Sequence, residues 1–225
     1  MCNVKNSFVL LPAAIIVFAG ALHAQAPDTI SWRTYELANP YFPHWEIAFP
    51  ATWKCTESDP YLCSRESVPA AGVTVTENGR RVILTRRSSI RVYSEDFLDD
   101  VEPPATVGIL VENPRKKPAG QNLYEYIQSQ NNAPETQQNN LERHIHAVTI
   151  HSPTVVNGST MVKAETTHNG FATDLYFLEK DETTFLAIRV VKFKPEEAKK
   201  YDADISAIMA SFKFLKGELD AQGSL

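Results

Sequence analysis

Aromatic and branched apolar side chains occupy every second position over several stretches of the chain, which is the period of a β-strand with one buried face. The segment 45–50 (Trp-Glu-Ile-Ala-Phe-Pro) shows this period and ends at a proline. The same criterion predicts strands at 88–93 and 106–112, which an acidic loop at 94–104 separates. The first half of the chain is therefore expected to contribute strands to a sheet.

A β-hairpin is predicted around Asn78-Gly79, because this pair lies between two apolar runs and supplies the two positive-φ positions of a type I′ turn. The register that a two-residue turn sets pairs Val75 with Val82 and Val73 with Leu84. Both apolar pairs then fall on one face, as a half-buried hairpin requires.

A helix is predicted to begin after Asn122, whose side chain can cap it, with Glu125 three residues later as in a capping box. Residues 128–140 are almost all Gln, Asn, Glu, Ala and Pro. That composition is typical of a solvated loop, so the helix is expected to be short.

Four further strand-like runs are joined by tight turns, which predicts an antiparallel meander in the second half. The runs are 144–152, 159–167, 172–179 and 183–192, and the turns between them are 157–158, 169–170 and 181–182. Pro195 then opens a C-terminal helix that is expected to be interrupted near Asp202. The predicted buried stripe of this helix is Ala198, Tyr201, Ile205, Ile208, Met209 and Phe212.

The N-terminus predicts export. Lys5 precedes an uncharged, mostly apolar stretch at 8–22 that leads to small residues before Ala24, which is the layout of a cleavable secretory signal. A retained anchor would need about 20 consecutive apolar residues, whereas this stretch is shorter and contains Pro12. We expect cleavage after Ala24 and a periplasmic or secreted protein.

The composition favours one mildly acidic domain. The chain has 22 basic and 27 acidic residues, which argues against nucleic acid or an anionic membrane as the main partner, since both select basic surfaces. No run after the leader is apolar enough to span a bilayer. The expected organisation is a signal peptide at 1–24, an N-terminal extension at 25–40, one domain at 41–216 and a C-terminal tail at 217–225.

Two cysteines, Cys55 and Cys63, survive removal of the leader, and Asp59-Pro60 between them is a turn former. In an oxidising compartment we expect these cysteines to form a disulfide. Free thiols or metal ligands are the alternatives.

Four segments that together span nearly the whole mature chain carry a family resemblance. They are Tyr41 with 47–53 (Ile-Ala-Phe-Pro-Ala-Thr-Trp), 123–127 (Leu-Tyr-Glu-Tyr-Ile), 156–158 (Val-Asn-Gly) and 204–214 (Asp-Ile-Ser-Ala-Ile-Met-Ala-Ser-Phe-Lys-Phe). In this order they resemble the PsbP-like α/β/α sandwich family. The resemblance implies an α+β fold in which helices cover an antiparallel sheet.

Members of that family are mostly non-enzymatic accessory or interaction domains, among them extrinsic photosystem subunits of the thylakoid lumen and a Ran-binding nuclear relative. The resemblance therefore implies an accessory or binding role without a cofactor. This chain departs from the photosynthetic members by its secretion signal and by the loop between its two cysteines. No metal or partner residue of those members can be matched to this sequence.

Two histidines form a candidate metal site. His144 and His146 lie two apart on a predicted strand, so both imidazoles face the same side, and His151 or His168 could complete the site. Zinc requires three or four converging ligands. The alternative is a pair of histidines on an exposed strand face.

Arg80, Arg81, Arg86, Arg87 and Arg91 form a candidate patch for an anion or a partner. Planar guanidinium groups suit carboxylates and phosphates, so an envelope protein or an anionic ligand is the expected partner. The alternative is a solvated hairpin face balanced by the acidic loop at 94–104.

Four aromatic residues near the start of the domain have two interpretations: they line a ligand groove, or they pack in the core. They are Tyr41, Phe42, Trp45 and Trp53.

The sequence contains no Gly-x-Ser-x-Gly elbow, no Gly-rich phosphate loop and no dinucleotide fingerprint. We therefore expect an exported, non-enzymatic accessory or binding domain. The alternative is a small exported hydrolase or metal-dependent enzyme that assembles its site from His144, His146 and their neighbours in space.

Overall fold

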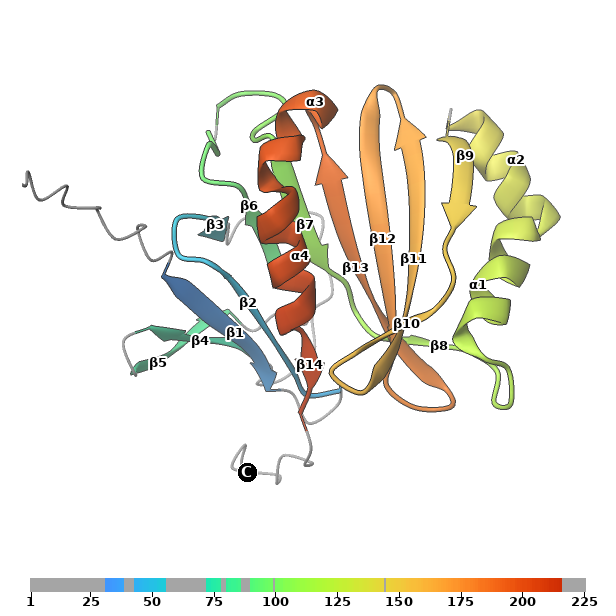
Figure 1. Ribbon diagram of the computed structural model, residues 1–225, viewed down its shortest axis with the longest axis horizontal. Helices are drawn as coiled ribbons and strands as arrows, with labels where there is room; N and C mark the ends of the chain where they lie inside the picture. Colours follow the sequence, from blue (N-terminus) through green and yellow to red (C-terminus); the bar gives the residue numbers. More distant parts are fainter. Residues whose placement is uncertain are drawn as a thin grey trace, which may run out of the picture.

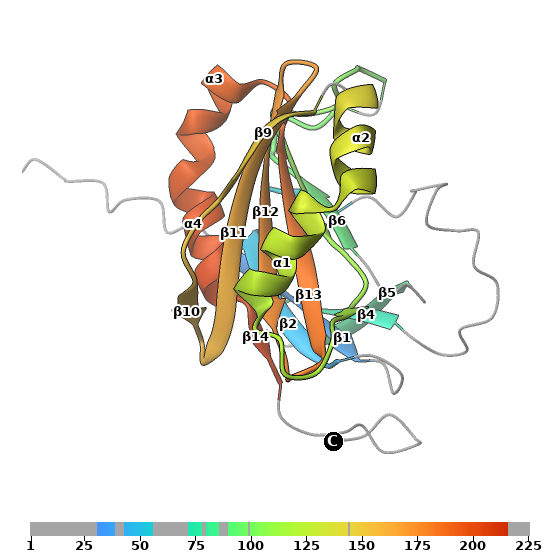
Figure 2. The same cartoon turned by 90° about the vertical axis from the view of Figure 1, so that its right-hand side faces the viewer.

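The computed structural model describes residues 31–38, 43–55, 72–77, 80–85, 90–98, 100–143 and 145–215. Their strands form two antiparallel sheets, one of five strands and one of nine, which lie beside each other in Figure 1. Figure 2 shows that helices lie on both sides of the larger sheet. The predicted α+β fold, an antiparallel sheet covered by helices, is confirmed.

The smaller sheet has the strand order β14-β2-β1-β4-β5. Its strands are β1 (Trp32–Ala38), β2 (Trp45–Pro50), β4 (Gly72–Glu77), β5 (Arg80–Thr85) and β14 (Lys213–Phe214). The sequence analysis placed 25–40 in an N-terminal extension and predicted no strand there. The pairing of β1 with β2 and β4 makes part of that segment a central strand of the sheet.

The predicted hairpin forms between β4 and β5, and Val75 pairs with Val82 as expected. Val73 pairs with Thr85, not with Leu84, because the register shifts between Val73 and Thr74. A β-bulge inserts one extra residue into one strand of a pair, which a simple two-residue period does not reveal. The predicted pairing of Val73 with Leu84 is therefore wrong.

The larger sheet has the order β10-β11-β12-β13-β7-β6-β3, with β8 pairing β13 and β9 pairing β11. Its strands are β3 (Lys54–Cys55), β6 (Ile90–Tyr93), β7 (Val107–Val111), β8 (Arg115–Lys116), β9 (Ile145–Ile150), β10 (Thr154–Val156), β11 (Ser159–His168), β12 (Phe171–Glu179) and β13 (Thr184–Lys192). The predicted meander is confirmed in β11, β12 and β13. Asn157 and Asn169 have φ of 47 and 48 degrees and each precedes a glycine at 83 degrees, as tight hairpin turns require.

Two helices follow β8, namely α1 (Leu123–Asn132) and α2 (Pro134–Glu142). The predicted cap forms, because the Asn122 side chain accepts a hydrogen bond from the Glu125 backbone N–H. The loop predicted at 128–140 is wrong, since most of that segment is helical. Its polar side chains lie on the solvent side, while Leu123 and Ile127 dock α1 on the sheet, so low apolarity does not prevent a helix there.

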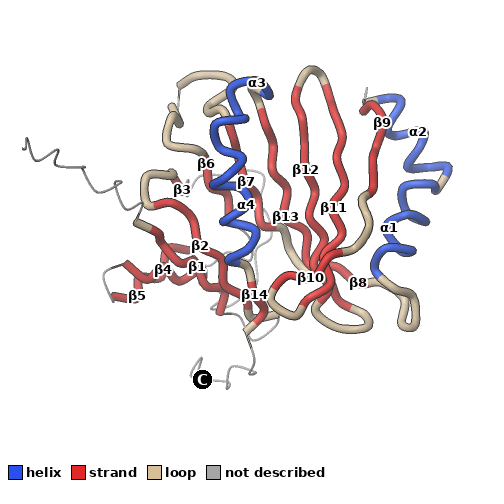
Figure 3. The backbone as a smooth tube through the Cα atoms, in the orientation of Figure 1, coloured by secondary structure: helices blue, strands red, loops and turns tan. Residues whose placement is uncertain are grey.

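The C-terminal helical segment consists of α3 (Pro195–Ala198), a 3-10 turn η1 (Lys199–Tyr201) and α4 (Asp202–Ser211). The interruption predicted near Asp202 is confirmed by this turn. All six residues of the predicted stripe are buried. Figure 3 shows α3 and α4 well separated from α1 and α2 along the larger sheet.

The core has two parts, one on each face of the larger sheet. The larger part lies between α4, β2 and that sheet and includes Trp45, Phe49, Ile109, Ile188, Ile208 and Phe212. The smaller part packs Leu123 and Ile127 of α1 against Val162, Ala164, Phe177, Phe185 and Ala187. The Ser211 hydroxyl accepts a hydrogen bond from the Ala48 N–H at 2.9 Å, which ties the end of α4 to β2. Within the described ranges, no helix is long and apolar enough to cross a bilayer.

Candidate functional site

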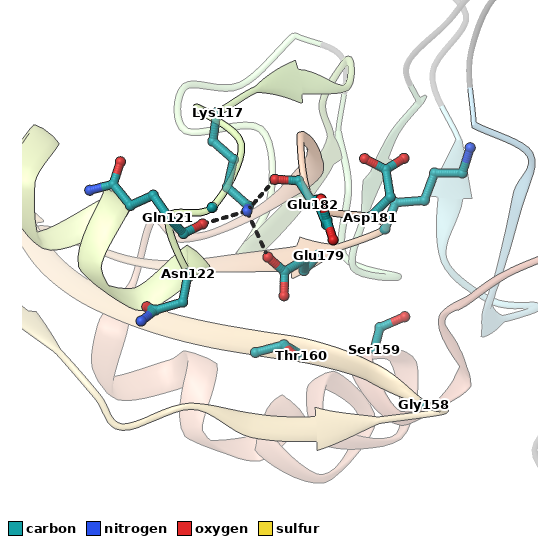
Figure 4. A pocket seen from close by; sticks show the side chains of 11 residues that line it. Lys117, Gln121, Asn122, Gly158, Ser159, Thr160, Glu179, Asp181 and Glu182 are labelled. Carbon is teal, nitrogen blue, oxygen red and sulfur yellow. Dashed lines mark hydrogen bonds and ion pairs between the residues drawn. The ribbon is translucent and has the colours of Figure 1, made fainter.

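A polar pocket of about 460 Å³ lies at one end of the larger sheet. Three parts of the chain meet there: the connector from β8 to α1, the turn between β10 and β11, and the turn between β12 and β13. Figure 4 shows the lining side chains. They are Lys117, Gly120, Gln121, Asn122, Gly158, Ser159, Thr160, Glu179, Lys180, Asp181 and Glu182.

Lys117 holds the walls of this pocket together. Its side chain is 2% exposed and lies 3.0 Å from the Glu179 carboxylate, measured from Nζ to Oε1. The same Nζ donates to the backbone carbonyls of Gln121 and Glu182, both at 2.6 Å. An ammonium has three donors, so all three are used within the protein, as the dashed lines in Figure 4 show.

The local backbone explains why Lys117 points inward. Residues Arg115 and Lys116 pair with the start of β13, and the Lys117 N–H donates to the Thr183 carbonyl at 2.9 Å. Both strand residues, Arg115 and Lys116, are exposed, whereas Lys117, which follows the strand and is anchored by this hydrogen bond, is buried.

Three carboxylates line the pocket beside the Lys180 ammonium and the amide and hydroxyl groups of Gln121, Asn122, Ser159 and Thr160. Glu179 is 23% exposed and has one oxygen on Lys117, which leaves its second oxygen toward the pocket. Asp181 accepts from the Thr183 N–H and hydroxyl. Burial raises the pKa of Asp181, but these hydrogen bonds outweigh it and hold that pKa below its ordinary value. The Asp181 carboxylate therefore stays ionised near neutral pH.

A second polar cluster crosses the α4 side of the larger sheet. Asp174 of β12 is buried and lies 3.4 Å from the Lys163 ammonium and 3.3 Å from the Lys192 ammonium. Lys163 also bonds Glu165 at 2.5 Å, and its Nζ lies 5.6 Å from the centre of the Tyr176 ring. The ion pairs of this cluster therefore link β11, β12 and β13.

Lys163 and Tyr176 of this second cluster both keep their protons near neutral pH. Burial lowers the pKa of Lys163, but its acidic neighbours and Tyr176 outweigh burial and raise that pKa to about 12. Burial raises the pKa of Tyr176 to about 12. Lys163 thus stays charged and Tyr176 stays neutral, which is the behaviour of a structural network and not of an acid–base pair.

The predicted histidine site falls largely outside the described side chains. His144 lies outside the described residues, and for His146 only the backbone pairing with Thr167 is described. His151 lies 3.4 Å from Glu165, and His168 contacts Asn169 at 2.9 Å. In the part of the chain that the structure covers, no three His, Cys, Asp or Glu side chains are placed to hold a metal ion.

The predicted arginine patch is divided between the two sheets. Arg80 and Arg81 belong to β5 of the smaller sheet, and Arg91 belongs to β6 of the larger one. Arg91 donates to the Tyr93 hydroxyl at 3.3 Å. Arg86 and Arg87 lie outside the described residues.

The predicted cysteines and aromatic residues are described only in part. Cys55 lies in β3 and pairs with Val92 of β6, whereas Cys63 lies outside the described residues. Trp45 and Trp53 are fully buried, and Trp53 meets Tyr201 edge to face at 5.6 Å. Core packing therefore accounts for both indoles, while Tyr41 and Phe42 lie outside the described residues.

The sequence does not predict the pocket. Lys117 bonds Gln121 of the same connector, but its partners Glu179 and Glu182 come from β12 and the turn that follows it. No local pattern marks Lys117 for burial, since Arg115 and Lys116 just before it are both exposed. The cluster at Asp174 was missed because each charge lies on a different strand.

No protein-family model and no curated protein sequence matches the chain. Among solved structures, the chain is similar to a protein of Bacteroides thetaiotaomicron, at 11% identity and a TM-score of 0.39, over 81% of this chain and 48% of that one. The chain thus spans about half the length of that protein. It is also similar to cyanobacterial PsbP (CyanoP) from Synechocystis sp., at 8% identity and a TM-score of 0.41, over 88% of this chain and 99% of that one. Both TM-scores are low, so the α+β assignment rests on the strand pairing described above.

Proposed function

We propose that this chain is an exported, non-enzymatic accessory domain that binds a small polar ligand in the pocket at Lys117. The observation that carries the proposal is the use of all three Lys117 donors within the protein. A site whose walls are fixed by internal hydrogen bonds is preorganised for binding. An ammonium held in this way is not free to act as a nucleophile or a general base.

The chemistry of the pocket selects the class of ligand. Its lining contains the carboxylates of Glu179, Asp181 and Glu182 and one further cation, Lys180, whereas the Lys117 donors are used internally. A ligand that donates hydrogen bonds, such as a small amine or a polyol, complements this excess of carboxylates.

Binding is tested by NMR titration of the isotope-labelled mature protein with a panel of small diamines and polyols. We expect backbone amide shifts confined to 117–122, 158–160 and 179–183. Glu179→Gln keeps an acceptor for Lys117 but removes the charge, so it should weaken binding, whereas Glu142→Gln on the exposed face of α2 should not. Shifts elsewhere, or none with any member of the panel, would contradict the proposal.

Export to the periplasm is the second part of the proposal. What supports it is the leader pattern at 1–24, with Lys5 before an apolar stretch and small residues before Ala24. Mass spectrometry of the protein isolated from its own cells should give a mature chain that begins at Gln25. A cytosolic chain that begins at residue 1 or 2 would refute this part.

A further inference from the structure

The loop between β6 and β7 carries two exposed apolar side chains at the end of the larger sheet opposite the pocket. Leu98 is 58% exposed and Val101 is 49% exposed. β13 begins at Thr184 beside the pocket and ends at Lys192, which pairs with Val107 at the base of this loop. The loop forms part of the upper end of the molecule in Figure 1. It is therefore separate from the site of the proposed function.

Backbone hydrogen bonds join the two sides of this loop. The Ser94 N–H donates to the Val107 carbonyl at 2.9 Å and the Leu98 N–H to the Pro104 carbonyl at 2.8 Å. These bonds close the loop at its base and again nearer its tip. A compact surface loop whose ends are close is frequently functional.

Side chains brace the same loop from inside. Asp96 accepts from the Thr106 hydroxyl at 2.5 Å, from the Thr106 N–H, and from the Ser94 hydroxyl. Phe97 stacks on Tyr93 with ring centroids 4.7 Å apart. Phe97 thus attaches the loop to the sheet, whereas Leu98 beside it stays in solvent. Ordering two apolar side chains in water brings no stability to the monomer.

Negative charge surrounds the two apolar side chains. Segment 94–104 has five acidic residues and no basic one, and Glu95, Asp100 and Glu102 are exposed. Burial, followed by the nearby charge of Glu95, raises the pKa of Asp204 at the start of α4. Lys200 is a cation on the same side, with its Nζ 4.7 Å from the Tyr201 ring centre.

The backbone of the β4–β5 hairpin lies away from this loop. Figures 1 and 2 both place the ribbon of β4 and β5 toward the lower end of the molecule, away from the loop that joins β6 to β7.

We propose that the loop from Ser94 to Thr106 is a docking surface for a basic partner protein, with Leu98 and Val101 entering an apolar pocket that is bordered by lysine or arginine on that partner. Rigid apolar anchors surrounded by charge are the usual composition of an interface centre and its rim. Opposite charge on the partner steers the encounter and fixes its orientation.

Site-specific photo-cross-linking of the full chain in its own cells tests the docking surface. The photoreactive residue p-benzoylphenylalanine replaces Leu98 or Val101, and it replaces Leu141 or Val155 in matched controls, which are 77% and 74% exposed at other places. We expect one adduct of defined mass at positions 98 and 101 that is absent at 141 and 155. Equal adducts at all four positions, no adduct, or an adduct with a second copy of this chain would overturn the proposal.

The cross-linked protein is then purified and titrated against the mature chain. Leu98→Ser with Val101→Ser should weaken its affinity by about tenfold or more, whereas Leu141→Ser with Val155→Ser should leave it unchanged. Asp100→Lys with Glu102→Lys keeps both anchors and should slow association and reduce the salt dependence of the rate. An affinity that responds to neither pair of changes overturns the proposal. Because the titration probes only this loop, its failure leaves the NMR test of the pocket unaffected.

Discussion

Lys117 is expected to stabilise the end of the larger sheet that carries the pocket. Lys117→Met removes an ammonium whose side chain is 2% exposed and leaves the Glu179 carboxylate without its countercharge. We expect the free energy of unfolding to fall by about 2–4 kcal/mol, since a partly buried charge without its partner is costly. Urea denaturation of the mature protein measures this loss.

The neighbouring lysine provides the control for that experiment. Lys116 has its Nζ on the Thr184 hydroxyl at 2.8 Å and is exposed, so Lys116→Met should change stability by less than about 1 kcal/mol. Similar losses for both lysines would show that the Lys117 contacts do not stabilise the fold.

Two aromatic rings lie over Gly108 in β7 and leave little room for a larger side chain. A Cβ at this position would lie 3.0 Å from Phe193 Cε2 and 3.0 Å from Tyr93 Cε1. Gly108→Ala should therefore destabilise the protein by about 1–3 kcal/mol through overpacking. Adding Phe193→Leu makes room, so the double-mutant cycle should show favourable coupling of at least about 0.5 kcal/mol. Strict additivity would mean that the rings adjust without cost.

At the scale of elements, Asn157 connects the turn between β10 and β11 to the end of α4. Its Nδ2 donates to the Ala210 carbonyl at 2.8 Å and to the Phe212 carbonyl at 2.7 Å. Asn157→Gly keeps the positive φ of 47 degrees but removes both hydrogen bonds. We expect a loss of about 1–2 kcal/mol in the free energy of unfolding.

Asn169 is the matched control, because it has nearly the same φ of 48 degrees and its side chain contacts the adjacent His168. Asn169→Gly should change stability by no more than about 0.5 kcal/mol. If both substitutions have the same effect, the backbone conformation and not the contact to α4 is responsible.

The loop between β6 and β7 should weaken in acid. Burial raises the pKa of Asp96, but hydrogen bonds from Ser94 and Thr106 outweigh it and hold that pKa below its ordinary value of 3.8. A depressed folded-state pKa contributes stability that is fully present above the unfolded-state value and is lost as the pH falls through the folded-state value. Hydrogen exchange of the loop amides should therefore accelerate as the pH drops below about 4, after correction for intrinsic exchange.

Thr106→Val tests the cause of that pH dependence. It removes one hydroxyl donor to Asp96, so the pKa of Asp96 should rise toward its ordinary value and the acid response should become smaller. An unchanged response would assign it to another group.

The sequence predicted those elements whose signals are local. The strands after residue 144, the Asn-Gly turns at 157–158 and 169–170, the cap at Asn122 and the buried stripe of the C-terminal helical segment all depend on period or on turn chemistry, and all are present. The bulge beside Val73 lies within one hairpin but is not visible in a two-residue period. The helix at 134–142 has no buried residue and therefore no apolar pattern, and the pairing of β1 depends on contacts with other strands. The pocket depends on three parts of the chain meeting around one lysine, which no single segment encodes.

For the molecule as a whole, the expected disulfide depends on export, because disulfides persist in oxidising compartments. Cys2 is removed with the predicted leader, so the mature chain should contain Cys55 and Cys63 as one disulfide and no free thiol. Its reduction should lower the free energy of unfolding by about 2.5 kcal/mol. Alkylation under denaturing conditions, with and without prior reduction, gives the number of thiols by mass. A mature chain that alkylates at both cysteines before reduction would disprove the disulfide.

The position of β13 between β12 and β7 affects the timing of folding. During synthesis the chain leaves the ribosome N-terminus first, so β7 is made long before its partner β13 at 184–192. The interval between β2 and its partner β14 at 213–214 is longer still. Contacts so distant in sequence form late. The larger sheet is therefore complete only after residue 192 has left the ribosome, and the smaller sheet only after residue 214 has.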